Sequence, residues 1–349
     1  MKESKIISNK NPNFIFCEEI KGLFHSDQYE IDNAFDIYSL LEDENKIYLA
    51  GSNSFCPQNL SIYLFQKNFI HVLTLIGHSD FVSSCKYFRK LSNKKEYLIS
   101  SSYSIFKPNE IIIWSIINFN NYTKTIKIKL KNRIERRIKY LLIENNNEDF
   151  LIYTSSNYLS CLLKLKEKKV LKKINSKNNI LNYYIWKNNK DKQNYIIQFN
   201  IDSITIFCPF LEKDLFDEIK IDELKEDNNS GCIIYNKNNT DIICILNEKG
   251  NFIFYDLYNK NVIFMIKIKD NNLMQICTYN KKYLIAVSET GFILIIDYEL
   301  KKIINKINWK NLKYIKTIKI IKHNILGEYL LLSGFPHQFL IFQNKNNFI

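Results

Sequence analysis

Residues 73–88 read LTLIGHSDFVSSCKYF, and the segment from Glu110 to Ile116 reads EIIIWSI. The first stretch carries a glycine-histidine pair, Gly77-His78, followed by a segment in which apolar and polar residues alternate. Such alternation predicts a β-strand, and the Ile-rich run ending near Trp114 predicts a second one. The fold depends on whether this pattern is isolated or is one unit of a repeat.

One strand type recurs seven times along the chain. The aligned positions are Tyr48, Tyr97, Phe150, Tyr195, Asp241, Tyr283 and Tyr329. The steps between them are 49, 53, 45, 46, 42 and 46 residues. These steps are close to the roughly 40 to 45 residues of a four-stranded propeller blade.

Each repeated strand is followed by a turn and a second strand, preceded by a further strand, and in most units followed by a more polar one. Few windows hold an apolar stripe at helical spacing, so helix is at most a minor component. The sequence therefore predicts an all-β fold, a single seven-bladed β-propeller of four-stranded antiparallel blades. The blades are expected to start near residues 34, 81, 134, 179, 230, 272 and 314.

The seventh unit lacks an outer strand, while a spare apolar strand, NFIFCEEI, lies at the amino terminus from Asn13 to Ile20. If this strand, within residues 13–22, completes the last blade, the ring closes without an exposed edge. We therefore expect a flexible arm over residues 1–12 and one propeller domain over residues 13–345. The alternative is a disordered arm throughout the amino terminus.

From about Asn13 to Gln343 the chain resembles the WD40-repeat family, and the opening stretch carries the best instance. In that family a histidine before the first strand, a Ser or Thr of the second and the Trp of the third can share a buried hydrogen-bond network. The resemblance implies that His78, Ser100 or Ser102, and Trp114 fill these places. It also implies a structural role for His78.

Several residues depart from the family pattern. Ser115 replaces the blade-ending aspartate, and the turn aspartate is lost in the insertion SIFKPNE, from Ser104 to Glu110. Asp256 and Asp297 keep the terminal acid in blades five and six without the tryptophan. The assignment therefore depends on the sevenfold repeat more than on signature dipeptides.

The sequence shows no catalytic or cofactor-binding pattern. The five histidines have no metal-ligand spacing, and there is no phosphate-binding glycine loop and no nucleophile elbow. We therefore expect no catalytic residue, no cofactor and no metal, although sites assembled from distant loops stay open. The eight cysteines contain no C-x-x-C pair and lie mostly in apolar runs, which predicts reduced, buried thiols.

Net charge gives the one compositional hint about partners. The chain carries a formal charge of +13, and residues 121–192 hold 18 Lys and Arg against 6 acidic residues. Lysines that alternate with apolar residues, as in TKTIKIKLK, are typical of the solvent face of an outer strand. The cluster Arg133, Arg136 and Arg137 is a candidate contact site, because arginine binds phosphate or carboxylate in a bidentate manner.

These observations favour a non-catalytic protein interaction scaffold, a subunit or adaptor of a larger complex. The alternative is binding of RNA, a phosphoinositide or another anionic surface through the basic region of blade three, although that region lacks the phosphoinositide motif of autophagy-type propellers. No apolar run is long enough for a signal peptide or a membrane span. We expect an intracellular protein and favour the cytoplasm over the nucleus.

Overall fold

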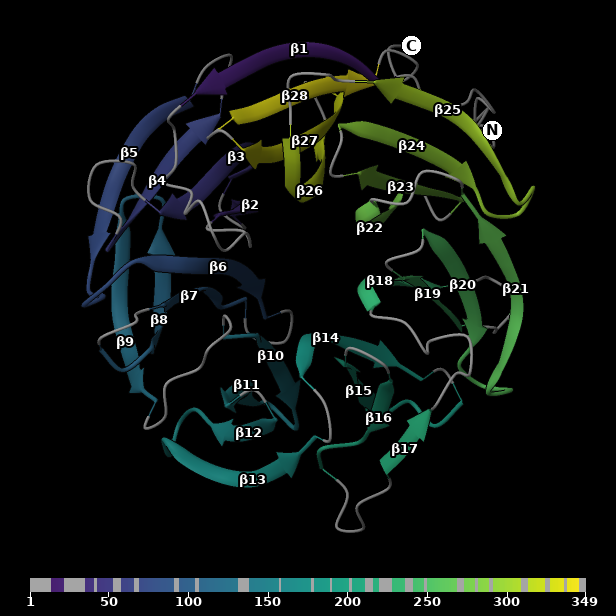
Figure 1. Cartoon of the computed structure of the whole chain (residues 1–349). Coiled ribbons are helices and arrows are strands. Elements are labelled where there is room, and N and C mark those ends of the chain that lie inside the picture. Colours follow the sequence, from purple (N-terminus) through teal and green to yellow (C-terminus); the bar gives the residue numbers. More distant parts are fainter. Residues whose placement is uncertain are drawn as a thin grey trace, which may run out of the picture.

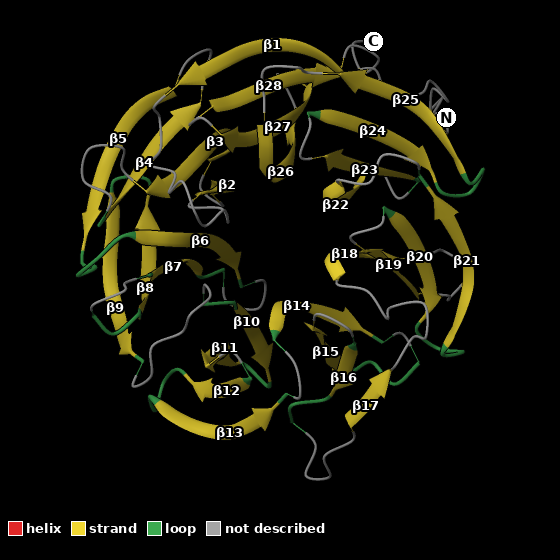
Figure 2. Cartoon of the chain, viewed as in Figure 1, coloured by secondary structure: helices red, strands yellow, loops and turns green. Residues whose placement is uncertain are grey.

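Every element among the described residues is a β-strand (Figure 2). The computed structural model describes residues 14–21, 35–40, 43–52, 58–65, 69–90, 94–103, 107–130, 138–156, 158–176, 179–188, 190–200, 203–210, 216–219, 228–235, 241–247, 250–268, 273–279, 282–288, 291–308, 313–323, 327–335 and 338–344. The predicted all-β class is therefore confirmed.

The strands form seven antiparallel sheets of four strands each, arranged around a common centre as a β-propeller (Figure 1). Blade one contains β2 (Phe35–Leu40), β3 (Asp43–Ser52), β4 (Asn59–Phe65) and β5 (Phe69–Ile76). Blade two contains β6 (Val82–Arg89), β7 (Glu96–Ser102), β8 (Glu110–Asn118) and β9 (Asn121–Lys129). Blade three contains β10 (Tyr140–Asn145), β11 (Glu148–Ser156), β12 (Leu159–Lys164) and β13 (Lys169–Asn175).

The chain continues around the ring in the same order. Blade four contains β14 (Ile180–Lys187), β15 (Asn194–Asn200), β16 (Ile204–Phe207) and β17 (Phe216–Ile219). Blade five contains β18 (Asn228–Tyr235), β19 (Asp241–Asn247), β20 (Asn251–Asp256) and β21 (Asn261–Lys267). Blade six contains β22 (Leu273–Tyr279), β23 (Tyr283–Ser288), β24 (Phe292–Asp297) and β25 (Lys302–Asn308).

Blade seven is built from both ends of the chain. It contains β26 (Lys313–His323), β27 (Gly327–Phe335), β28 (Gln338–Asn344) and, as its outer strand, β1 (Phe14–Lys21) (Figure 1). The β1–β28 pairing runs from Phe14 opposite Asn344 to Lys21 opposite Gln338. Closure by an amino-terminal strand is therefore confirmed. The expected arm over residues 1–12 lies outside the described residues, and the domain bounds stay a prediction.

The middle strands of a blade are buried on both faces, because each blade is covered by a neighbour on either side. All seven residues of β19 and all six of β23 are buried. Such strands have near-continuous apolar sequences rather than alternating ones. The outer strand β9 instead alternates exposed and half-buried residues along most of its length.

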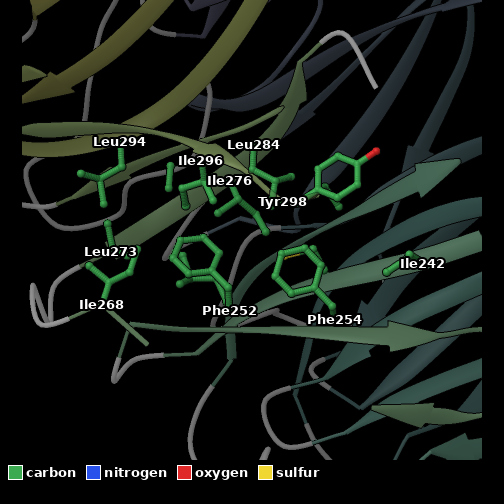
Figure 3. Packing of buried hydrophobic residues seen from close by; sticks show 14 residues of the cluster. Ile242, Phe252, Phe254, Ile268, Leu273, Ile276, Leu284, Leu294, Ile296 and Tyr298 are labelled. Carbon is green, nitrogen blue, oxygen red and sulfur yellow. The ribbon is translucent and has the colours of Figure 1, made fainter. Parts of the chain in front are cut away.

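The hydrophobic core is divided among the junctions between blades. Six apolar clusters of described residues each combine side chains of two neighbouring blades. Figure 3 shows the cluster between blades five and six, in which Phe252 and Phe254 of β20 lie near Leu284 and Leu294 of blade six. A blade therefore completes its core only when its neighbours are in place.

A β-bulge interrupts the pairing of the outer strand in six of the seven blades as the structure describes them. The register shifts fall between Ile62 and Tyr63, Ile113 and Trp114, Leu162 and Leu163, Phe254 and Tyr255, Ile295 and Ile296, and, in β1, Phe16 and Glu18. A bulge leaves one residue unpaired and increases the local twist, which discourages further strands from adding to the outer edge.

Asp36 links three blades near the centre of the ring. Its Oδ1 atom lies 2.7 Å from Lys319 Nζ of blade seven, and its Oδ2 atom accepts a 2.7 Å hydrogen bond from the backbone N–H of Tyr87 in blade two. Burial alone would lower the pKa of Lys319, but the Asp36 carboxylate outweighs it and raises the pKa. Lys319 therefore stays protonated at neutral pH, and the contacts of Asp36 join blades seven, one and two.

The closest approach of blades four and five depends on Gly231 of β18. A Cβ atom added there would lie 2.2 Å from Cζ of Phe199, a buried side chain of β15. The phenyl ring of Phe199 is packed on all sides, so it cannot move aside without disturbing the core between the two blades.

We expect Gly231→Ala to lower the free energy of unfolding by about 1–3 kcal/mol, because overpacking forces neighbouring side chains out of their preferred rotamers. Chemical denaturation measures this loss. Phe199→Leu in the same background should recover part of it, since the smaller side chain leaves room for the methyl group. Equal and additive losses from the two substitutions would contradict the contact.

Candidate interaction surface

His78 lies in the loop between β5 and β6, and its ring is hydrogen-bonded to Ser100 of the second strand of blade two, which also binds Trp114 of the third strand. Its Nε2 atom lies 2.7 Å from Ser100 Oγ, and Ser100 Oγ accepts a 2.9 Å hydrogen bond from Trp114 Nε1. The structure thus brings together three of the four residues suggested for the structural network. Ser102 is separate, because its Oγ accepts from the backbone N–H of Glu110 at 3.1 Å.

Glu110 is the residue of this network that the sequence did not reveal. Its Oε2 atom accepts a 2.9 Å hydrogen bond from the Ser79 N–H and lies 3.8 Å from His78 Nδ1. Its Oε1 atom lies 2.9 Å from Lys127 Nζ. In the sequence, Glu110 is the last residue of the insertion SIFKPNE, in which the turn aspartate of the family pattern is lost. The signal available was an acidic residue directly before the apolar strand.

Burial determines the charge of His78, and hydrogen bonds determine that of Glu110. Desolvation lowers the pKa of His78 to about 4, although Glu110 acts in the opposite direction. Burial also acts to raise the pKa of Glu110, but the hydrogen bonds from Lys127 and Ser79 outweigh it and the pKa lies below its usual value. At neutral pH the imidazole is therefore neutral and the carboxylate charged. The His78 side chain is 1% exposed, so it is placed to stabilise the loop.

Gly77 allows the loop to lie directly on the indole ring. A Cβ atom at this position would lie 2.9 Å from Cη2 of Trp114 and 3.1 Å from Cδ1 of Ile112. Two further hydrogen bonds join the same loop to the β7–β8 connection. The Tyr103 N–H donates to the Phe81 carbonyl at 2.9 Å, and Lys107 Nζ donates to the Ser79 carbonyl at 2.9 Å.

Two apolar side chains are exposed at this fixed loop, one at the end of β5 and one in the loop itself. Ile76 is 74% exposed and Phe81 is 46% exposed, and they flank the buried His78. Lys107 is also exposed there, and its ammonium group touches the same loop. We call Ile76, Phe81 and Lys107 the blade-two rim. Apolar side chains presented by a rigid loop are typical of contact surfaces.

The basic region is described only in part. Arg133, Arg136 and Arg137 lie outside the described residues, so their role as a contact site stays a prediction. Lys127 binds Glu110 and also donates to the Gly77 carbonyl at 2.8 Å, which gives it a structural role. Lys124 and Lys129 are exposed on the outer strand β9, as expected of a solvated edge.

The two terminal acids of blades five and six shape the turns into the outer strands. Asp256 Oδ1 accepts from the backbone N–H groups of Tyr258 at 2.8 Å and Asn259 at 2.9 Å. Asp297 Oδ1 accepts from the Leu300 N–H at 2.9 Å. In blade two, Asn118 accepts from the Asn120 N–H at 3.0 Å. An amide therefore stabilises this turn three residues after Ser115.

The described residues include no group of three or more His, Cys, Asp or Glu side chains placed to hold a metal ion. The same part of the chain contains no helix that is long and apolar enough to cross a membrane. The six cysteines in the described part of the chain are thiols rather than disulfides: Cys85, Cys161, Cys208, Cys232, Cys244 and Cys277. Burial raises the pKa of the Cys85 thiol, which keeps it protonated.

No protein-family model matches the chain, and no match is found among curated proteins. Two crystal structures are similar to it: BBS1N in complex with ARL6DN, soaked with mercury in one case and with lead in the other. Each matches with a TM-score of 0.67 at 10% sequence identity. The alignment covers 96% of this chain and 98% of the matched chain in the crystal structure. The likeness is one of fold. Membership of the WD40-repeat family stays a prediction.

We expect the free energy of unfolding to fall as the pH is lowered from about 7 to about 5. The pKa of His78 is about 4 in the folded chain against 6.5 for a free histidine, so the unfolded chain takes up the proton first. The stabilisation is complete above the unfolded pKa and is lost as the pH falls toward the folded one, on the order of 3 kcal/mol in full.

Urea unfolding of wild type and His78→Gln measures this slope. Measurements above about pH 5 separate the His78 contribution from the titration of carboxyl groups such as Glu110. The contribution of those groups to stability is lost only below their unfolded pKa. The variant should be less stable at pH 7 but flatter across the window. His71→Gln, which changes an exposed histidine of β5, should keep the wild-type slope. An unchanged slope in His78→Gln would refute the assignment.

Proposed function

We propose that this protein is a non-catalytic scaffold for protein-protein interaction, acting as a subunit or adaptor of a larger intracellular complex. The observation that carries the proposal is the blade-two rim, where Phe81 is exposed on a loop fixed by buried hydrogen bonds and Ile76 is exposed at the end of the strand that leads into this loop. An aromatic side chain held rigidly at the surface loses little conformational entropy on binding, which makes it an effective anchor.

The fold supports the same proposal. The similar BBS1N structures are complexes with a second protein, ARL6DN. Likeness of fold does not by itself assign a function, so the argument depends on the surface of this chain. The blade-two rim combines two apolar residues with Lys107, and this combination suits a partner that presents an apolar pocket next to acidic residues.

We expect the double variant Ile76→Ser, Phe81→Ser to lose its partner while keeping its stability, because both side chains are exposed. Loss of an aromatic anchor and its neighbour should weaken binding by about 2–4 kcal/mol. Affinity purification from cells at low salt, followed by direct binding measurements with the recovered protein, tests this.

The matched control is Ile263→Ser, Leu300→Ser, which removes apolar side chains that are 45% and 58% exposed in blades five and six. It should bind as wild type does. Failure of the wild-type protein to recover a stable partner, or equal losses in both double variants, would contradict the proposal.

A further inference from the structure

Asp241 is an exception within the repeat. The other six aligned positions hold Tyr or Phe, whereas blade five has an aspartate as the first residue of β19. Asp241 is 0% exposed. A carboxylate taken out of water is costly unless hydrogen bonds or an opposite charge compensate it.

The contacts of Asp241 compensate only one of its two oxygen atoms. Oδ2 accepts hydrogen bonds from Trp186 Nε1 at 2.7 Å and from the Tyr258 hydroxyl at 2.9 Å. Oδ1 is buried and has no hydrogen-bond partner in the part of the chain that the structure describes. Both donors are neutral, so the site is short of one donor and of positive charge.

Aromatic rings surround this carboxylate at the junction of blades four and five. The Trp186 and Tyr258 rings meet edge to face, with centroids 5.3 Å apart and planes at 68°. The centroids of the Tyr195 and Trp186 rings are 5.3 Å apart. Aromatic faces attract cations through their quadrupole, most strongly for Trp and Tyr.

The chain already places an ammonium group on this cluster. Lys190 Nζ lies 4.5 Å from the centroid of the Tyr258 ring. Lys190 is exposed and belongs to the β14–β15 turn, where its backbone N–H donates to Asn188 Oδ1 at 2.9 Å. From solvent inward the order is therefore Lys190, the half-buried Tyr258 and the buried Asp241. Lys190 covers the ring but leaves Oδ1 unpaired.

We propose that Asp241, Trp186 and Tyr258 form a binding site for the ammonium group of a lysine side chain from a protein partner, and that Lys190 occupies its outer part in the free chain. This rests on the proposed function, since the occupant belongs to a partner. A partner lysine that replaces Lys190 lies on the Tyr258 ring with the uncompensated carboxylate behind it. Among the described residues, the contact of the Lys190 ammonium group is an exposed cation–π contact with Tyr258, so displacement of this side chain costs little.

The probe for the test is Nα-acetyl-lysine N-methylamide, which keeps the side-chain ammonium group. The uncharged analogue is Nα-acetyl-norleucine N-methylamide. The full chain labelled with ¹⁵N-tryptophan reports binding through the Trp186 indole resonance, assigned with Trp186→Phe. Trp114 serves as an internal reference, because its indole N–H is bonded to Ser100 in blade two. We expect the lysine probe to shift the Trp186 resonance and the norleucine analogue to leave it unchanged.

Two variants separate a binding site from a structural role. Lys190→Ala removes the internal occupant and should tighten probe binding about two- to five-fold. Lys301→Ala is its matched control, since Lys301 Nζ lies at the same 4.5 Å distance over the Phe264 ring, and it should change nothing. Asp241→Asn keeps an acceptor for Trp186 and Tyr258 without the charge, and it should weaken binding at least ten-fold.

The proposal is overturned if the Trp186 resonance does not respond to the lysine probe in either wild type or Lys190→Ala. Equal binding of the norleucine analogue, or undiminished binding to Asp241→Asn, also overturns it. If methylamine binds as well as the lysine probe, the site takes free amines and the assignment to a partner lysine fails. Failure of the purification experiment with a positive probe titration would reject the scaffold function but leave the cation site.

Discussion

The pairing of β1 with β28 is the constraint on which the rest of the structure depends. Each apolar cluster is shared between two neighbouring blades, so no blade buries its faces alone. A ring of such units is stable only when the last blade is complete, and here that blade takes its outer strand from the amino terminus. Closure gives every blade a neighbour on both faces and leaves no incomplete blade in the propeller.

Within the closed ring, polar contacts lock blade against blade and fix the loops between them. Asp36 joins the first, second and last blades through one ion pair and one backbone hydrogen bond. The network of His78, Ser100, Trp114 and Glu110 fixes the β5–β6 loop, which carries Phe81 and directly follows Ile76. The buried acid Asp241 is a carboxylate with one oxygen that has no hydrogen-bond partner among the described residues, as is also true of Nδ1 of His78. Rigid support and an incomplete polar site together suit a binding platform.

The sequence predicted the fold because each repeat carries the same strand pattern, and the surplus strand at one end matched the deficit at the other. It also pointed to the contact between His78, Ser100 and Trp114 through the family resemblance. It could not reveal the Asp36–Lys319 pair or the approach of Glu110 to His78, because such contacts join residues whose distance depends on blade packing rather than on spacing. The aspartate at position 241 was visible in the alignment, but its burial and unpaired oxygen emerge only in three dimensions.

Amide hydrogen exchange in β28 tests the closed ring most directly, since β28 lies between β27 and β1. The full chain should protect β28 as strongly as β27, because both strands are paired on both sides or buried within the sheet. A chain lacking residues 1–21 should lose protection in β28 first and should self-associate through the opened edge. Weak protection of β28 in the full chain, or protection that survives the deletion, would contradict closure by the amino-terminal strand.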